Sequence, residues 1–227
     1  MKKLILTAAS AALAMGSAFA VNYSDSTTDV VGTFAGFSHL NIASMDVTND
    51  LSSITFKFNL VGNIQSTDWG KYCVFIDRAS GGTTNSNGWA RPIGMAAGAE
   101  SWLGSWVNSG GGFEAYNFGG SWGLAGATYL STPGMTQSIS ANSVSLKLNL
   151  ATIGLTPGMT ICFDGITTAG GGGDGAVDSL SNSGPQIGNW PDYSQVGCQT
   201  YKLVPEPASY AVMALGLAGI LLRRKKG

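Results

Sequence analysis

The chain has 227 residues, of which only 11% are charged, and its formal net charge at pH 7 is −1. Charged residues make up about 25% of an average globular protein. Half of the 12 basic residues lie at the two ends, as Lys2, Lys3 and the four residues 223–226. The rest of the chain therefore offers no basic face, which argues against DNA or RNA binding.

The first 20 residues predict a secretory signal peptide. Lys2 and Lys3 form a basic start, residues 4–15 are apolar, and Ala18-Phe19-Ala20 fits a cleavage site. We expect the exported chain to begin at Val21. Residues 21–203 are then an extracytoplasmic part of a length that one domain can fill.

Residues 54–60 and 144–150 alternate apolar and polar side chains, which predicts strands with one buried face. Further strands are expected at residues 30–37, 40–47, 72–77, 91–98, 101–108, 113–118, 160–166 and 199–203. Glycine-rich segments and Pro-Gly turns separate them. We predict an all-β fold, a single β-sandwich of the jelly-roll or immunoglobulin-like kind, between the signal peptide and a C-terminal transmembrane helix.

The six tryptophans suggest a ligand site, because a flat ring can stack on the apolar face of a sugar. Trp89 and Trp122 lie in segments rich in Gly, Ser and Asn, which favours exposed positions. Asp77 and Arg91 flank the same loop and could bond sugar hydroxyls. The alternative for each tryptophan is a place in the core.

Acidic residues raise two further hypotheses. The loop of residues 169–178 carries Asp174 and Asp178 as candidate calcium ligands, although a flexible loop without a metal is the alternative. No other cofactor is expected. A small polysaccharide hydrolase would need two carboxylates about 5 to 9 Å apart. Its candidates are Asp77, Glu100, Glu114, Asp164, Asp178 and Asp192.

Three cysteines in an exported chain predict one disulfide and one free thiol. Cys73, Cys162 and Cys198 allow three pairings. We favour Cys162 with Cys198, because this bridge would tie the last strand into the sheet.

The body of the chain resembles DOMON-type sandwiches, which are related to family-nine carbohydrate-binding modules. The resemblance lies in residues 69–77, 88–93 and 148–164. It implies a β-sandwich that binds sugars or, in some members, haem. Haem needs an axial ligand, and His39 is the single histidine of the chain.

The C-terminal segment, residues 204–227, has three parts. Pro205-Glu206-Pro207 stops the preceding strand, residues 208–222 carry no charge, and Arg223 and Arg224 open a basic cluster. As a helix, the uncharged segment would reach roughly 22 Å, short of the ~30 Å hydrocarbon core.

These three parts resemble the PEP-CTERM sorting signals of Gram-negative bacteria. The resemblance implies recognition by a membrane enzyme called exosortase and cleavage near Pro205-Glu206-Pro207. The protein would be anchored in the membrane by the C-terminal helix and would then reach the cell surface or the extracellular matrix. An ordinary membrane anchor is the alternative.

Taken together, the sequence predicts an exported envelope or matrix protein whose sandwich is not an enzyme. Its expected partners are an exosortase-type enzyme, the membrane before processing, and exopolysaccharide. The alternatives are a structural or adhesive surface protein without a small ligand and the small hydrolase.

Overall fold

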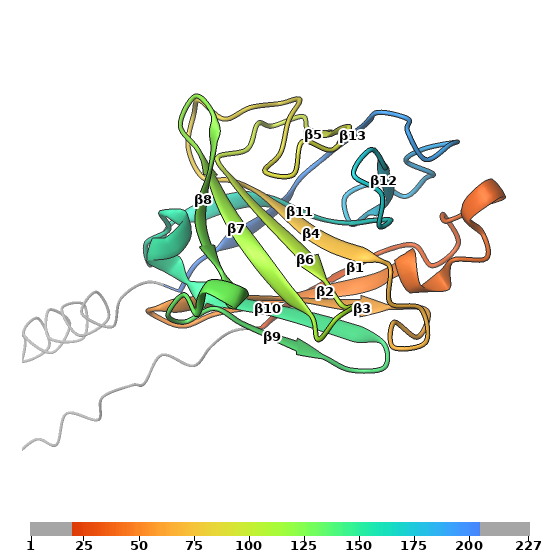
Figure 1. Ribbon diagram of the computed structural model, residues 1–227. Helices are drawn as coiled ribbons and strands as arrows, with labels where there is room; N and C mark the ends of the chain where they lie inside the picture. Colours follow the sequence, from red (N-terminus) through yellow and green to blue (C-terminus); the bar gives the residue numbers. More distant parts are fainter. Residues whose placement is uncertain (1–19, 205–227) are drawn as a thin grey trace, which may run out of the picture. The chain divides into compact units, whose positions relative to one another are not determined.

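The computed structural model describes residues 20–204. The expected signal peptide, except Ala20, and the expected C-terminal helix lie outside these residues. The described part is all-β, with strands joined by loops and by short 3-10 helices (Figure 1). Within this part, no helix has the length and apolar character needed to cross a membrane.

One sheet has five antiparallel strands, and we call it sheet A. Its strand order is β1-β2-β3-β10-β9. The strands are β1 (Val21–Ser24), β2 (Ile42–Asn49), β3 (Ser53–Leu60), β10 (Ser143–Asn149) and β9 (Thr136–Ile139). β3 and β10 are the two strands with the clearest alternation, and they pair with each other so that Phe56 lies opposite Leu146.

The second sheet has seven strands, and we call it sheet B. Its order is β12-β11-β4-β6-β7-β8, and β14 pairs with the first half of β11. The strands are β12 (Ala176–Ser179), β11 (Thr160–Thr168), β4 (Lys71–Asp77), β6 (Ser101–Trp106), β7 (Gly112–Phe118), β8 (Trp122–Ala127) and β14 (Gln199–Lys202). Two short parallel strands make a third sheet, β5 (Ile93–Met95) and β13 (Ser194–Val196).

Sheets A and B face each other across the main hydrophobic core, as a β-sandwich requires (Figure 1). Phe56 and Phe58 of β3 belong to this core together with Val74 of β4 and Leu103 of β6, and all four are fully buried. The intervening residues of β3 point away from it, which explains the alternation in the sequence.

Sheet B has a second core on its other face. Phe75 and Trp102 are fully buried there under Ile93 of β5 and Val196 of β13. Segments 78–100 and 180–198, which carry β5 and β13, therefore cover sheet B. This cover explains why β4 is buried along most of its length instead of on alternate residues.

The prediction of a strand at residues 30–37 is wrong. This segment contains the 3-10 helix η1 (Gly32–Phe34), and η2 (Ser38–Leu40) follows it. Gly32 has a positive φ of 60°, which interrupts an extended backbone. The apolar residues that suggested a strand, Val30 and Phe34, instead belong to a small separate cluster. The other 3-10 helices are η3 (Thr128–Leu130) and η4 (Leu150–Ile153).

Candidate functional site: a half-exposed aromatic surface

The outer face of sheet B carries large aromatic side chains at the ends of β6 and β7. Because side chains alternate along a strand, Trp102, Gly104 and Trp106 of β6 share this face. The register places Gly104 opposite Glu114 of β7. Trp102 is covered, whereas Trp106 is half-buried, so the face changes from core to surface along β6.

Gly104 makes room for the indole ring of Trp89. A Cβ atom at this position would lie 2.4 Å from the ring, so the Trp89 side chain can rest on β6 only because residue 104 is glycine. The Nε1 atom of Trp89 donates a hydrogen bond of 2.6 Å to Oε2 of Glu114. Trp89 lies in a loop, and its packing on Gly104 and its hydrogen bond to Glu114 together fix its side chain on sheet B.

The carboxylate of Glu114 accepts hydrogen bonds from three aromatic side chains. Besides Trp89, the hydroxyl of Tyr116 donates to Oε2 at 3.0 Å and that of Tyr129 to Oε1 at 2.9 Å. Burial and the bond to Glu114 raise the pKa of Tyr116 to about 12. The bond to Glu114 also raises the pKa of Tyr129, so both hydroxyls remain donors at neutral pH.

Trp106 completes a row of rings. Its centroid lies 6.5 Å from that of Trp89 and 6.3 Å from that of Tyr129, with interplanar angles of 38° and 40°. Tyr129 is 58% exposed, and the other rings are half-buried. We call Trp89, Trp106, Tyr116 and Tyr129 the aromatic surface.

A groove of about 290 Å³ adjoins the aromatic surface at Gly112. The Trp106 ring would lie 2.6 Å from a Cβ atom at Gly112, which also lines the groove. The other lining residues are Gly110, Gly111, Thr128, Met135, Thr136 and Gln137. The amide of Gln137 donates to the carbonyls of Trp106 and Gly112, so β9 is held beside the aromatic surface.

Arg91 supports Trp89 from the covering loop. Its guanidinium carbon lies 5.4 Å from the ring centroid of Trp89, within the range of a cation–π contact. The side chain is buried and donates to Oγ1 of Thr168 at 3.1 Å and to the carbonyl of Gly171 at 2.7 Å. Arg91 therefore lies beneath the surface as a support.

The structure places Trp122 and Asp77 outside the aromatic surface. Trp122 is half-buried on β8, where its ring lies 5.4 Å from that of Phe118 and its Nε1 donates to Ser86. Asp77 ends β4 beside Glu100, and burial together with this acid raises the pKa of Asp77. The sequence suggested four sugar-binding residues, and of these only Trp89 and Arg91 lie together in the structure.

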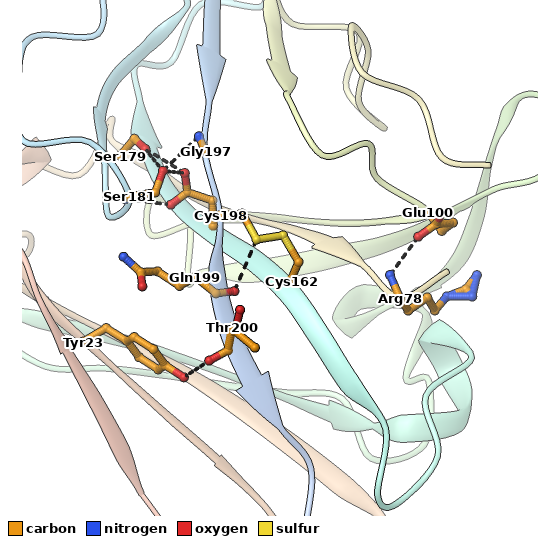
Figure 2. Close-up of a disulfide and its surroundings, with 11 residues drawn as sticks. Tyr23, Arg78, Glu100, Cys162, Ser179, Ser181, Gly197, Cys198, Gln199 and Thr200 are labelled. Atoms are coloured by element: carbon orange, nitrogen blue, oxygen red, sulfur yellow. Dashed lines mark hydrogen bonds between the residues drawn. A yellow bond between two sulfur atoms is a disulfide. The ribbon is translucent and has the colours of Figure 1, made fainter. Parts of the chain in front are cut away.

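Cys162 and Cys198 are joined by a disulfide, with their Cα atoms 5.5 Å apart. Figure 2 shows the bridge between β11 and the segment that leads into β14. Cys73 is the free cysteine and is buried. The bridge therefore fastens the last strand before the C-terminal segment.

The two calcium candidates have different hydrogen-bond partners. Oδ2 of Asp174 accepts from the backbone N–H of Gly171 within its own loop. Asp178 lies in β12 and is buried, and its Oδ2 accepts from the backbone N–H of Ile42 in β2. Asp178 approaches two acids that the sequence did not single out as ligands, Asp25 and Asp29.

Sequence reasoning missed Trp106, Tyr116 and Tyr129 as members of a surface and Glu114 as its centre. The signal that could have pointed to Trp106 is the alternation of Trp102, Gly104 and Trp106 along one strand, which places the three on one face. What the sequence did not contain is the register between β6 and β7, which brings Glu114 beneath Trp89.

The last described residues are hydrogen-bonded to the body of the protein. The backbone N–H of Leu203 donates to Met159, and that of Val204 donates to Oδ1 of Asn49, so the body is hydrogen-bonded up to its last described residue. Residues 20–204 thus form an all-β body, and the remaining C-terminal segment follows it in the sequence.

That segment is a PEP-CTERM protein-sorting motif, because residues 203–226 match the model of this family. The match includes Pro205, Glu206, Pro207, Arg223 and Arg224, which lie outside the described residues. It confirms the resemblance seen in the sequence. The motif implies an exported protein with a C-terminal membrane-anchoring region, which an exosortase-type enzyme processes. No curated protein matches the chain.

Proposed function

We propose that this exported protein binds glycan, such as exopolysaccharide, through its aromatic surface, without catalysing a reaction. The observation that carries the proposal is the row of Trp89, Trp106 and Tyr129 rings fixed around Glu114. Half-exposed rings offer flat apolar area for sugar stacking, and the hydroxyl and carboxylate groups offer hydrogen bonds to sugar hydroxyls.

The fixed geometry favours binding over simple burial. Rings held in place before the ligand arrives lose little conformational freedom on binding, which improves affinity. Glu114 is the one charged residue of this set, and its charge is shared among three donors. A neutral glycan therefore fits this site better than an acidic one.

We also assign the sandwich to the immunoglobulin-like kind. The order β2-β3-β10-β9 corresponds to strands A-B-E-D of that fold, and β14-β11-β4-β6-β7 corresponds to G-F-C-C′-C″. The jelly-roll alternative does not account for this order. The proposed resemblance to DOMON-type sugar-binding sandwiches points to the same ligand class, and the proposed destination is the cell surface or matrix.

The test is co-sedimentation of the full chain, in detergent micelles, with a panel of insoluble neutral glycans. We expect Tyr129→Ala to weaken binding about tenfold, a loss of roughly 1.4 kcal/mol. The matched control is Tyr193→Ala, because Tyr193 is similarly exposed, at 50%, and lies outside the aromatic surface.

Two outcomes would contradict the proposal. If wild type binds no glycan of the panel, the structural or adhesive alternative is favoured. If Tyr193→Ala weakens binding as much as Tyr129→Ala, the ligand lies elsewhere. Release of soluble sugar during the assay would instead favour the hydrolase.

A further inference from the structure

Three acidic side chains from distant parts of the chain meet beside β12. Asp25 follows β1, Asp29 lies in the loop before η1, and Asp178 lies in β12. Their ligand oxygens all lie within 4.8 Å of one another. This acidic cluster is separate from the aromatic surface, and the inference drawn from it does not depend on glycan binding.

Several oxygens of the acidic cluster are buried without a hydrogen-bond donor. Asp29 is 4% exposed, and its carboxylate has no side-chain donor: only the backbone N–H groups of Asp29 itself and of Val30 approach it, without reaching good hydrogen-bond geometry. Oδ2 of Asp25 is also buried and without a donor. Asp178, in contrast, accepts from the backbone N–H groups of Ile42 and Ser179. A carboxylate buried without a partner is strongly unfavourable, so Asp29 indicates a missing positive partner.

Asn41 supplies a further buried oxygen that is independent of the acids. It is 5% exposed, and its Oδ1 has no donor. Its Nδ2 donates at 3.2 Å to the carbonyl of Thr27, in the loop between Asp25 and Asp29. An amide oxygen is therefore held against the loop that carries two of the three acids.

Within the described part of the chain, no basic side chain forms an ion pair with the acidic cluster. Among residues 20–204 the one ion pair joins Lys57 to Asp46 in sheet A. Three carboxylates held this close without a basic partner repel one another, and a bound cation would remove that repulsion.

We propose that Asp25, Asp29 and Asp178 bind one calcium ion, with Oδ1 of Asn41 as a further ligand. The donors are all oxygens, which hard cations prefer. Ca–O distances of about 2.3 to 2.6 Å allow two ligands of one ion to lie up to ~5 Å apart, which accommodates the observed spacing. Mg²⁺, with distances of about 2.0 to 2.1 Å and strict octahedral geometry, suits three irregularly spaced acids less well.

The bound ion would clamp the N-terminal segment to both sheets. Asp25 continues from β1 of sheet A, Asp178 belongs to sheet B, and the loop with Asp29 joins β1 to η1. Calcium would therefore stabilise the sandwich without taking part in chemistry. Exported modules commonly hold such ions with dissociation constants of about 10⁻⁴ to 10⁻³ M.

The experiment uses the full chain in detergent micelles, stripped with EDTA and dialysed. Calcium chloride is titrated to about 10 mM, a concentration that saturates sites of this class, while binding heat and Tm are recorded, and magnesium chloride serves as the comparison ion. We expect calcium to raise Tm by about 3 to 10 °C, the shift that ligand binding at this excess gives for a domain of this size.

Asp29→Asn is the test variant, because it keeps the shape of the side chain and removes its charge. We expect it to lower calcium affinity at least about tenfold, since ligand charge sets affinity at such sites. In EDTA its Tm should equal or exceed that of wild type, because an unpaired buried charge is gone. Asp174→Asn, in the neighbouring glycine-rich loop, should bind calcium as wild type does.

The proposal is overturned if wild type shows neither binding heat nor a Tm rise with calcium, or if Asp29→Asn keeps both. Loss of binding in Asp174→Asn alone would place the site in the glycine-rich loop and overturn it too. Should Asp29→Asn fail to fold, Asp25→Asn gives the same test, because Asp25 is only partly buried.

Discussion

Cys73 is a free thiol in the middle of β4, where the cover over sheet B buries it completely. Burial raises the pKa of this thiol to about 12, although Arg91 and Lys71 act in the opposite direction. Because the thiolate is the reactive form, the native protein should not react with a thiol reagent at pH 8. One equivalent should react after unfolding in urea without reductant. Reaction in the native state would show that the cover opens.

Asp50 opens the turn between β2 and β3 and should make stability depend on pH. Burial alone would raise its pKa, but hydrogen bonds from the backbone and hydroxyl groups of Ser52 and Ser53 outweigh this and lower the pKa to about 2. Because the pKa of Asp50 is lower in the folded state than its ordinary value of 3.8, the ionised carboxylate stabilises the folded state at pH values above 3.8. This stabilisation is lost as the pH falls through about 2.

We therefore expect Asp50→Ala to lower the free energy of unfolding at pH 7 by about 1 kcal/mol, after a discount for solvent screening. Near pH 2 the difference from wild type should shrink, because the wild-type carboxyl is partly protonated there. Urea unfolding at both pH values measures this. Asp68→Ala, on another exposed turn, is the control, and a difference that grows as pH falls would contradict the assignment.

At the scale of elements, the disulfide holds β14 and the segment before it against β11. Cys162 and Cys198 are 36 residues apart, and β12 and β13 lie between them. Closing a loop of this length restricts the unfolded chain, which corresponds to about 3 to 4 kcal/mol of stability. Cys198→Ser should lose this amount in urea unfolding. The double variant Cys162→Ser/Cys198→Ser should lose no more, whereas additive losses would contradict the bridge.

The strands that sequence reasoning found are those with a clear apolar pattern. β3 and β10 alternate strictly, because one face of each lies on the main core. β8 was missed because its residues Gly123, Ala125 and Gly126 are too small to mark an apolar face. β9 was missed because Thr136–Ile139 is mostly polar, as suits an edge strand. The short strands β1, β12 and β13 were missed as well.

The candidate site was predictable only in part, because it is assembled by register and by loop cover. Composition pointed to Trp89, and its contact with Arg91 lies within one loop. The bond from Trp89 to Glu114 spans 25 residues and depends on how β6 pairs with β7. The acidic cluster is still less local, since Asp25 and Asp178 meet only when both sheets have formed.

At the scale of the whole molecule, the last two described residues, Leu203 and Val204, are also the first two residues of the sorting motif. Oδ1 of Asn49, the last residue of β2, accepts hydrogen bonds from the hydroxyl of Tyr201 and from the backbone N–H of Val204. These two bonds hold the end of the described chain against β2. Both contacts join residues of the described part, 20–204, so they fix the last described residue on the body.

Intact mass of the protein recovered from the membrane and medium fractions of its native host tests the processing directly. We expect a chain that begins at Val21, because Ala18-Phe19-Ala20 forms the signal cleavage site. We expect it to end near Pro205, because the sorting motif covers residues 203–226. The control variant replaces Pro205, Glu206 and Pro207 by alanine, and it should keep its C-terminus in the membrane fraction. A wild-type mass that includes Arg223 and Arg224 in both fractions would show instead that the segment is a permanent anchor, and partners of the body would then have to be sought at the membrane face.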